Sequence, residues 1–84
     1  MPEQTEQPEN VTTLAIHGEY IELYKILKIE NMAASGGEAK FLISQGLVQV
    51  NGEIETRKRR KTVPGDCVEY NGEQVRITRN GSPK

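Results

Sequence analysis

Apolar positions recur at helical spacing in the first half of this 84-residue sequence. In residues 19–29, Tyr20, Leu23, Tyr24 and Leu27 stand at positions i, i+3, i+4 and i+7, which is the spacing of one face of an amphipathic helix. Ile26 lies beside this face, and Glu22, Lys25 and Lys28 form the exposed stripe. This stretch therefore predicts a first helix over residues 19–29, preceded by a turn and followed by a short connector.

Residues 35–45 predict a second helix with clear boundaries. Ser35 and Glu38 form an S-x-x-E capping box at its start. Gly46 stands at the position where a left-handed residue commonly ends a helix. The buried face would consist of Ala39, Leu42 and Ile43.

The rest of the chain alternates with a period of two, which indicates strands. Two Asn-Gly pairs predict hairpins, because a type I′ turn needs positive φ at both central residues. The first hairpin would span residues 47–56, with Val48 and Val50 on one face. The remaining predicted elements are a strand at 12–16, a type II turn at Val63-Pro-Gly-Asp66, and a second hairpin with strands at 67–70 and 74–78.

This order predicts an α+β fold, with two N-terminal helices packed on a small, mostly antiparallel sheet of four to five short strands. Residues 12–78 would form the single domain. Residues 1–11 are rich in Glu, Gln and Pro and predict a disordered acidic tail, and residues 79–84 predict a flexible tail.

Composition limits the classes of function. With 35% hydrophobic and 5% aromatic residues, a chain of this length supports one core and no deep substrate cavity. The single cysteine, Cys67, and the single histidine, His17, provide too few ligands for a zinc site and exclude an intramolecular disulfide. No motif pairs a nucleophile with a base. We therefore expect no enzyme, metal, cofactor or small-molecule substrate.

The sequence has no apolar run of the ~20 residues that a membrane span requires, and no signal peptide. We expect a cytoplasmic monomer that makes no membrane contact.

Five consecutive cations, Arg57, Lys58, Arg59, Arg60 and Lys61, follow the first hairpin. The net charge is still only −1, because acidic residues elsewhere balance this basic run. A run of like charges is most often a solvated loop. This one lies inside the predicted domain, where mutual repulsion favours an anionic partner, with nucleic acid as the first choice.

The start of the second helix is another candidate anion site. Its first N–H groups are unpaired, and Gly36 and Gly37 have no side chains to keep a phosphate away. Lys40 follows one turn later. The alternative is ordinary capping, with Glu38 already placed at that helix end. Both interpretations stay open on these residues alone.

The aromatic residues are expected in or beside the core. Exposed aromatic side chains are able to stack on RNA bases, and Phe41 or Tyr70 would be candidates in that case. Core positions are the preferred prediction for all four, Tyr20, Tyr24, Phe41 and Tyr70.

Several of these residues resemble the S-four RNA-binding domain, also called the αL motif. The similarity covers about residues 20–70 and rests on Ser35, Ala39 and Ile43, on Gly46-Leu-Val-Gln-Val-Asn-Gly52 and on Val63-Pro-Gly-Asp-Cys-Val68. Residues 37–40 and 55–59 are similar to the small stand-alone bacterial YbcJ/YaaA-like branch of that family.

The resemblance implies that the two helices and the following hairpin form an RNA-binding surface. Many members carry an arginine directly after the capping serine, where this chain has Gly36. Taken by position, and with the basic run included, the RNA-binding residues would be Ser35, Gly36, Gly37, Lys40, Val50, Asn51, Gly52, Arg57, Lys58, Arg59, Arg60 and Lys61.

The implied partner is structured RNA, ribosomal or tRNA-like, bound through phosphate and shape in ribosome assembly or translation. The alternative is an adaptor whose basic run docks an acidic protein.

Overall fold

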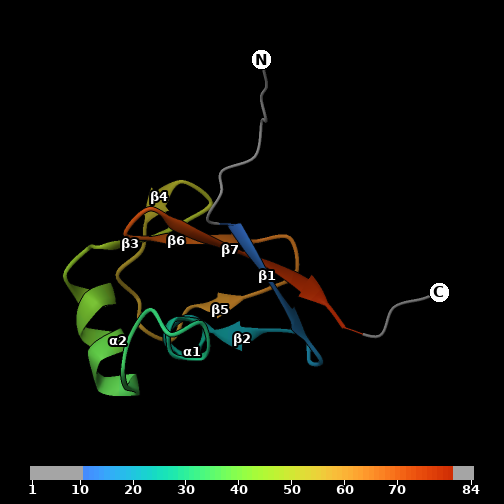
Figure 1. Cartoon of the computed structure of the whole chain (residues 1–84), viewed down its shortest axis with the longest axis horizontal. Coiled ribbons are helices and arrows are strands. Elements are labelled where there is room, and N and C mark those ends of the chain that lie inside the picture. The colour runs from blue at the N-terminus through green and yellow to red at the C-terminus, as the bar shows by residue number, and fades with distance from the viewer. Residues whose placement is uncertain (1–10, 81–84) are drawn as a thin grey trace, which may run out of the picture.

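The computed structural model describes residues 11–80 (Figure 1). Two helices follow two strands and precede five more, so the α+β prediction is confirmed, although the helices do not begin the domain. The elements are β1 (Val11–Ile16), β2 (Ile21–Glu22), α1 (Leu23–Ile29), α2 (Gly36–Ser44), β3 (Val48–Val50), β4 (Glu53–Ile54), β5 (Lys61–Thr62), β6 (Cys67–Tyr70) and β7 (Glu73–Arg79).

The main sheet has five strands in the order β1-β7-β6-β3-β4. Its β7–β6, β6–β3 and β3–β4 pairs are antiparallel, while β1 lies parallel to β7 with Val11 opposite Gln74. A separate two-stranded sheet pairs β2 with β5. The sequence did not predict β2 or β5, because two-residue strands carry no readable alternation.

The turn predictions are correct. Asn51 and Gly52 have φ of 55° and 85°, and Asn71 and Gly72 have 55° and 81°, as type I′ turns require. At the predicted type II turn, Gly65 has φ of 101° and the Asp66 N–H donates to the Val63 carbonyl at 3.0 Å. These turns set the register of β3, β4, β6 and β7.

The core lies between the helices and one face of the main sheet. Alternate residues of the strands, such as Val48 and Val50 in β3, point into it. In Figure 1 the helices and β2–β5 lie below the β3–β6–β7 part of the sheet. The buried apolar residues are Ile16, Leu23, Ile26, Leu27, Ala33, Ala39, Leu42, Ile43, Val48, Val50, Val68, Val75 and Ile77.

Helix α1 is shorter than predicted, because its expected first turn is extended instead. Ile21 and Glu22 pair with β5, and the helix begins at Leu23. No side chain caps it. The Leu23 N–H donates to the Arg60 carbonyl at 2.9 Å, and the Tyr24 N–H to the Lys58 carbonyl at 3.1 Å. A distant segment therefore fixes this helix start, which local apolar spacing cannot reveal.

Helix α2 matches its prediction closely. The Glu38 N–H donates to Ser35 Oγ at 3.1 Å, while the Glu38 carboxylate accepts from the Ala34 N–H at 2.7 Å, one residue before the usual capping-box partner. At the other end, Gly46 has φ of 78° and its N–H bonds the Ile43 carbonyl. The Leu47 N–H bonds the Leu42 carbonyl, which completes a Schellman motif.

The strands at both ends of the described chain extend slightly beyond residues 12–78, the predicted bounds of the domain. Val11 belongs to β1, Arg79 ends β7, and the Asn80 N–H donates to the Ile16 carbonyl at 2.8 Å. The rest of the two predicted tails lies outside the described residues.

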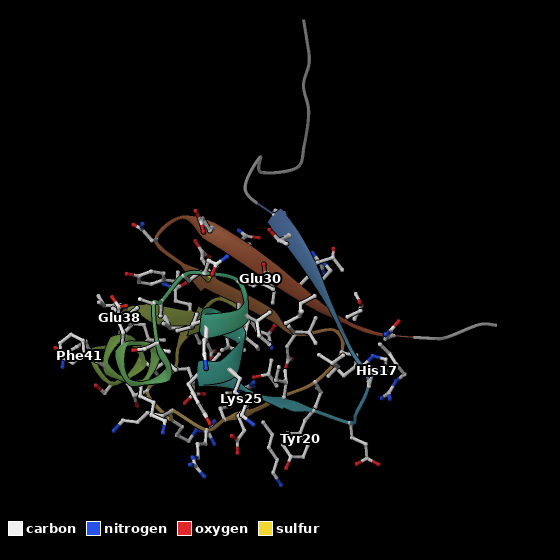
Figure 2. All side chains as sticks on the ribbon, turned by 60° about the horizontal axis from the view of Figure 1, so that its bottom comes forward. His17, Tyr20, Lys25, Glu30, Glu38 and Phe41 are labelled. Atoms are coloured by element: carbon white, nitrogen blue, oxygen red, sulfur yellow. The ribbon has the colours of Figure 1, made fainter. Side chains whose placement is uncertain are left out.

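The aromatic prediction is half correct. Tyr24 and Tyr70 are half-buried against the core, whereas Tyr20 is 45% exposed and Phe41 58% exposed. Figure 2 shows both exposed rings pointing away from the body of the molecule, from different sides of it.

Candidate nucleic-acid interface

The basic run follows β4: residues 57–60 form a loop attached to the start of α1, and Lys61 begins β5. The carbonyls of Lys58 and Arg60 accept the hydrogen bonds from α1 described above, so the loop backbone faces the helix. Its side chains Arg57, Arg59, Arg60 and Lys61 line an open pocket on the surface. The fold therefore brings four of the five cations of the basic run together.

The five cations of the basic run are not equivalent in the structure. Arg57 donates two hydrogen bonds to Glu55, both at 2.9 Å. Arg60 lies 3.1 Å from the Glu55 carboxylate and 3.2 Å from that of Asp66, and its side chain is only 24% exposed. Within residues 11–80, no salt bridge involves Lys58, Arg59 or Lys61. These three are the cations most available to a partner.

Both carboxylates of this network are held in the charged form. The hydrogen bond from the Arg57 side chain lowers the pKa of Glu55 to about 2. Burial raises the pKa of Asp66, but hydrogen bonds from Asn51, the Val63 N–H and Arg60 outweigh burial, so this pKa lies below its ordinary value. Near neutral pH the network is therefore fully ionised.

Tyr24 connects α2 to the basic loop. Its N–H bonds the Lys58 carbonyl, and Lys40 Nζ lies 4.6 Å from the centroid of its ring. A Cβ placed on Gly36 would lie 3.6 Å from the Tyr24 Cε2 atom, so the ring packs beside the start of α2. Gly37 is exposed next to it. The structure thus brings Gly36, Lys40 and the loop into one neighbourhood.

The hairpin tip has a structural role that the sequence did not indicate. Asn51 Nδ2 donates to Asp66 Oδ1 at 3.0 Å, and Asn51 Oδ1 accepts from the Cys67 N–H at 3.0 Å. Val50 is 5% exposed and belongs to the core. Of the three predicted hairpin residues, only Gly52 is both exposed and free of such contacts, since a Cβ added there would meet no atom within 4 Å.

Sequence reasoning missed Tyr20 and Glu55 as neighbours of the basic loop. Lys61 Nζ lies 5.0 Å from the centroid of the Tyr20 ring. Helical spacing assigned Tyr20 to the core, and no local signal contradicted that assignment. The alternating segment around Glu55 predicted a strand face but gave no sign of its two arginine partners.

Two negative observations also concern the described range. No helix in residues 11–80 is both long and apolar enough to cross a membrane. The same residues contain no group of three or more His, Cys, Asp or Glu side chains arranged to hold a metal ion.

Two helices, a short hairpin and a docked basic loop on a small α+β sheet together define a compact binding domain of the αL type. The family model described as the S4 domain matches residues 14–78. The chain belongs to the S4 domain family.

Two of the proteins that are similar in sequence come from Escherichia coli and Bacillus subtilis. YbcJ of Escherichia coli K12, a candidate RNA-binding protein by its description, is 43% identical over 58 residues, which are 69% of this chain and 83% of YbcJ. RlbA of Bacillus subtilis 168, described as a probable ribosome maturation protein, is 41% identical over 59 residues, 70% of this chain and 83% of RlbA.

The solution structure of E. coli YbcJ is similar in fold. The TM-score is 0.59 at 36% identity, and the match covers 93% of this chain and 96% of the other. That structure is described as having an αL motif involved in RNA binding.

Proposed function

We propose that this protein is an RNA-binding module that binds structured RNA, ribosomal or another non-coding RNA, through phosphate and shape contacts. The family membership and the descriptions of YbcJ and RlbA support this proposal. The RlbA description favours ribosome maturation or translation as the process. RNA helices hide their base edges in a deep, narrow major groove, which favours contacts to the backbone.

The observation that carries the proposal is a pocket lined by arginine and lysine side chains, of which Arg59 and Lys61 have no carboxylate partner in the described part of the chain. The backbone of Lys58 and Arg60 accepts hydrogen bonds from the start of α1, and Lys40 Nζ of α2 lies 4.6 Å from the ring centroid of Tyr24, whose N–H donates to Lys58. Cations held together on a fixed backbone repel one another, and a phosphate chain relieves this repulsion. Binding would release the counterions condensed on the RNA.

A salt titration tests this directly. The affinity for a fluorescein-labelled ribosomal RNA hairpin is measured by anisotropy at increasing KCl concentrations. Because each phosphate contact contributes to the slope of log K against log salt, Arg59→Gln should lower the magnitude of that slope by about 1 and weaken binding at low salt.

Arg76→Gln is the charge-matched control. Arg76 is exposed on β7 between the buried residues Val75 and Ile77, so it lies on the sheet face opposite the helices. This variant should retain the wild-type slope. A salt-independent affinity, or equal losses in the two variants, would contradict the proposal. Capture of an acidic protein that persists after RNase treatment would instead support the adaptor alternative.

A further inference from the structure

Tyr20 is an exposed aromatic residue beside the basic loop. It is 45% exposed, and Lys61 Nζ lies 5.0 Å from the centroid of its ring. It stands immediately before β2, outside both helices and outside the apolar core. A large ring at such a position adds little to folding, since burial is what makes an aromatic side chain stabilising.

The register of the small sheet places Tyr20 on the same face as Lys61. Glu22 is opposite Lys61, and Ile21 is opposite the fully buried Thr62. Because side chains alternate between the two faces of a strand, Tyr20 shares the outer face with Glu22 and Lys61. The nearby Glu22 carboxylate is 3.8 Å from Lys25, so a cation balances its negative charge.

Next to this face, the pocket of the basic loop supplies positive charge. Arg59 and Lys61 belong to its lining, and neither has a carboxylate partner in the described part of the chain. Lys61 thus contacts both the Tyr20 ring and the pocket that Arg59 lines, so a ring and two cations lie close to one another, as the base and phosphate of a nucleotide would require. The ring offers a stacking surface to the base, and the cations attract the phosphate.

Building on the RNA binding proposed above, we propose that Tyr20, Lys61 and Arg59 form a subsite for one unpaired nucleotide of the bound RNA. The base stacks on the face of the Tyr20 ring that is turned away from Lys61, and the adjoining phosphate lies against Arg59 and Lys61. The subsite selects RNA that has a bulged or looped-out nucleotide next to a helix. A fully paired helix cannot fill it, because its bases are already stacked.

Phe41 provides an internal comparison. It is even more exposed than Tyr20, at 58%, but it lies on α2 at another side of the molecule, as Figure 2 shows. Among the described residues, no cation lies over its ring, whereas Tyr20 and Tyr24 each have one. Both residues are exposed, but only Tyr20 also lies beside a cation of the basic run.

The test compares two RNA hairpins that differ only in one bulged adenosine. Affinities are measured by anisotropy for the wild-type protein and for Tyr20→Ala, Tyr20→Phe and Phe41→Ala. We expect Tyr20→Ala to weaken binding of the bulged hairpin about tenfold or more, since stacking on an aromatic side chain contributes strongly per base. Binding of the fully paired hairpin should stay within about twofold of wild type.

Tyr20→Phe should retain the preference for the bulge, because it keeps the ring, and Phe41→Ala should change neither affinity. Circular dichroism melting of Tyr20→Ala checks that the domain stays folded. An equal loss on both hairpins, or no loss on the bulged one, would overturn the subsite. Failure of the general RNA-binding proposal appears differently, as no salt-dependent binding of either hairpin by the wild-type protein.

Discussion

Arg59 and Arg60 are adjacent residues of the same type whose side chains have different surroundings. Arg60 lies between Glu55 and Asp66, whose side chains are 12% and 14% exposed. Arg59 is exposed and has no salt bridge within the described range. One arginine therefore joins parts of the fold, while its neighbour remains available to a partner.

At the scale of the residue, we predict that Arg60→Gln destabilises the domain and that Arg59→Gln does not. Removing Arg60 takes away the cation that Glu55 and Asp66 share, although Glu55 keeps its hydrogen bonds from Arg57 and Asp66 keeps those from Asn51 and the Val63 N–H. The loss should therefore be about 1 kcal/mol of unfolding free energy. Arg59→Gln should stay within about 0.5 kcal/mol of wild type. Urea unfolding followed by circular dichroism measures both, and similar midpoints for the two variants would disprove the distinction.

Gly46 and Gly37 lie near the two ends of α2, and only Gly46 has a backbone conformation that calls for glycine. Gly46 adopts a positive φ of 78° and completes the Schellman motif. Gly37 lies in the first turn, where an added Cβ would be 3.9 Å from Ser35 Oγ and would meet no other atom. The first glycine is required by backbone geometry. The second has room for a side chain, so the fold itself does not require glycine there.

At the scale of the element, we predict opposite effects for alanine at these positions. Gly46→Ala should destabilise by about 1 kcal/mol, because a residue with a Cβ is strained at positive φ. Gly37→Ala should stabilise by about 0.4–1 kcal/mol through the lower entropy of the unfolded chain. Thermal melts of both variants check the sign. If a phosphate approaches this helix start, Gly37→Ala should also bind RNA more weakly despite its higher stability.

For the molecule as a whole, local signals were enough to predict most of the fold. Asn-Gly turns, the capping box and Gly46 each act within a few residues, so the hairpins and α2 were correctly placed. The start of α1, the β2–β5 pair and the parallel β1–β7 pair depend on segments far apart in the sequence. Apolar spacing alone cannot distinguish Tyr20 in a helix from Tyr20 beside a two-residue strand.

The candidate site was predictable to a similar degree. The basic run and Lys40 were found because charge and helix position are visible in the sequence. The sequence did not reveal which cations of the run have carboxylate partners. Glu55 and Asp66 reach Arg60 only after the hairpin and the Pro-Gly turn have formed. Asn51 is a related case, since its contacts with Asp66 and Cys67 cross from one turn to another.

The lowered pKa values of Glu55 and Asp66 predict how the stability of the whole domain changes in acid. The pKa of Glu55 is lowered to about 2 in the folded state, from an ordinary value of 4.5, and that of Asp66 is also lowered. Their stabilisation is therefore complete above about pH 4.5 and is lost as the pH falls toward 2. We expect the melting temperature to decrease over this range.

The matched variants are Glu55→Gln and Glu53→Gln. Glu55→Gln should melt at a lower temperature near neutral pH and should lose less stability on acidification, because the titrating group is gone. Glu53 is exposed and forms no salt bridge with any residue in 11–80, so its variant should follow the wild-type profile. Parallel profiles for all three proteins would show that Glu55 does not carry the acid response.

The attachment of the basic loop to α1 has a consequence for the order of folding. The first two N–H groups of α1 donate hydrogen bonds to the carbonyls of Arg60 and Lys58. Both residues come later in the chain, after α2 and the first hairpin. A seven-residue helix is too short to persist alone. During synthesis, α1 therefore gains these acceptors only after the loop has emerged, so the segment that carries the cations also completes the start of the first helix.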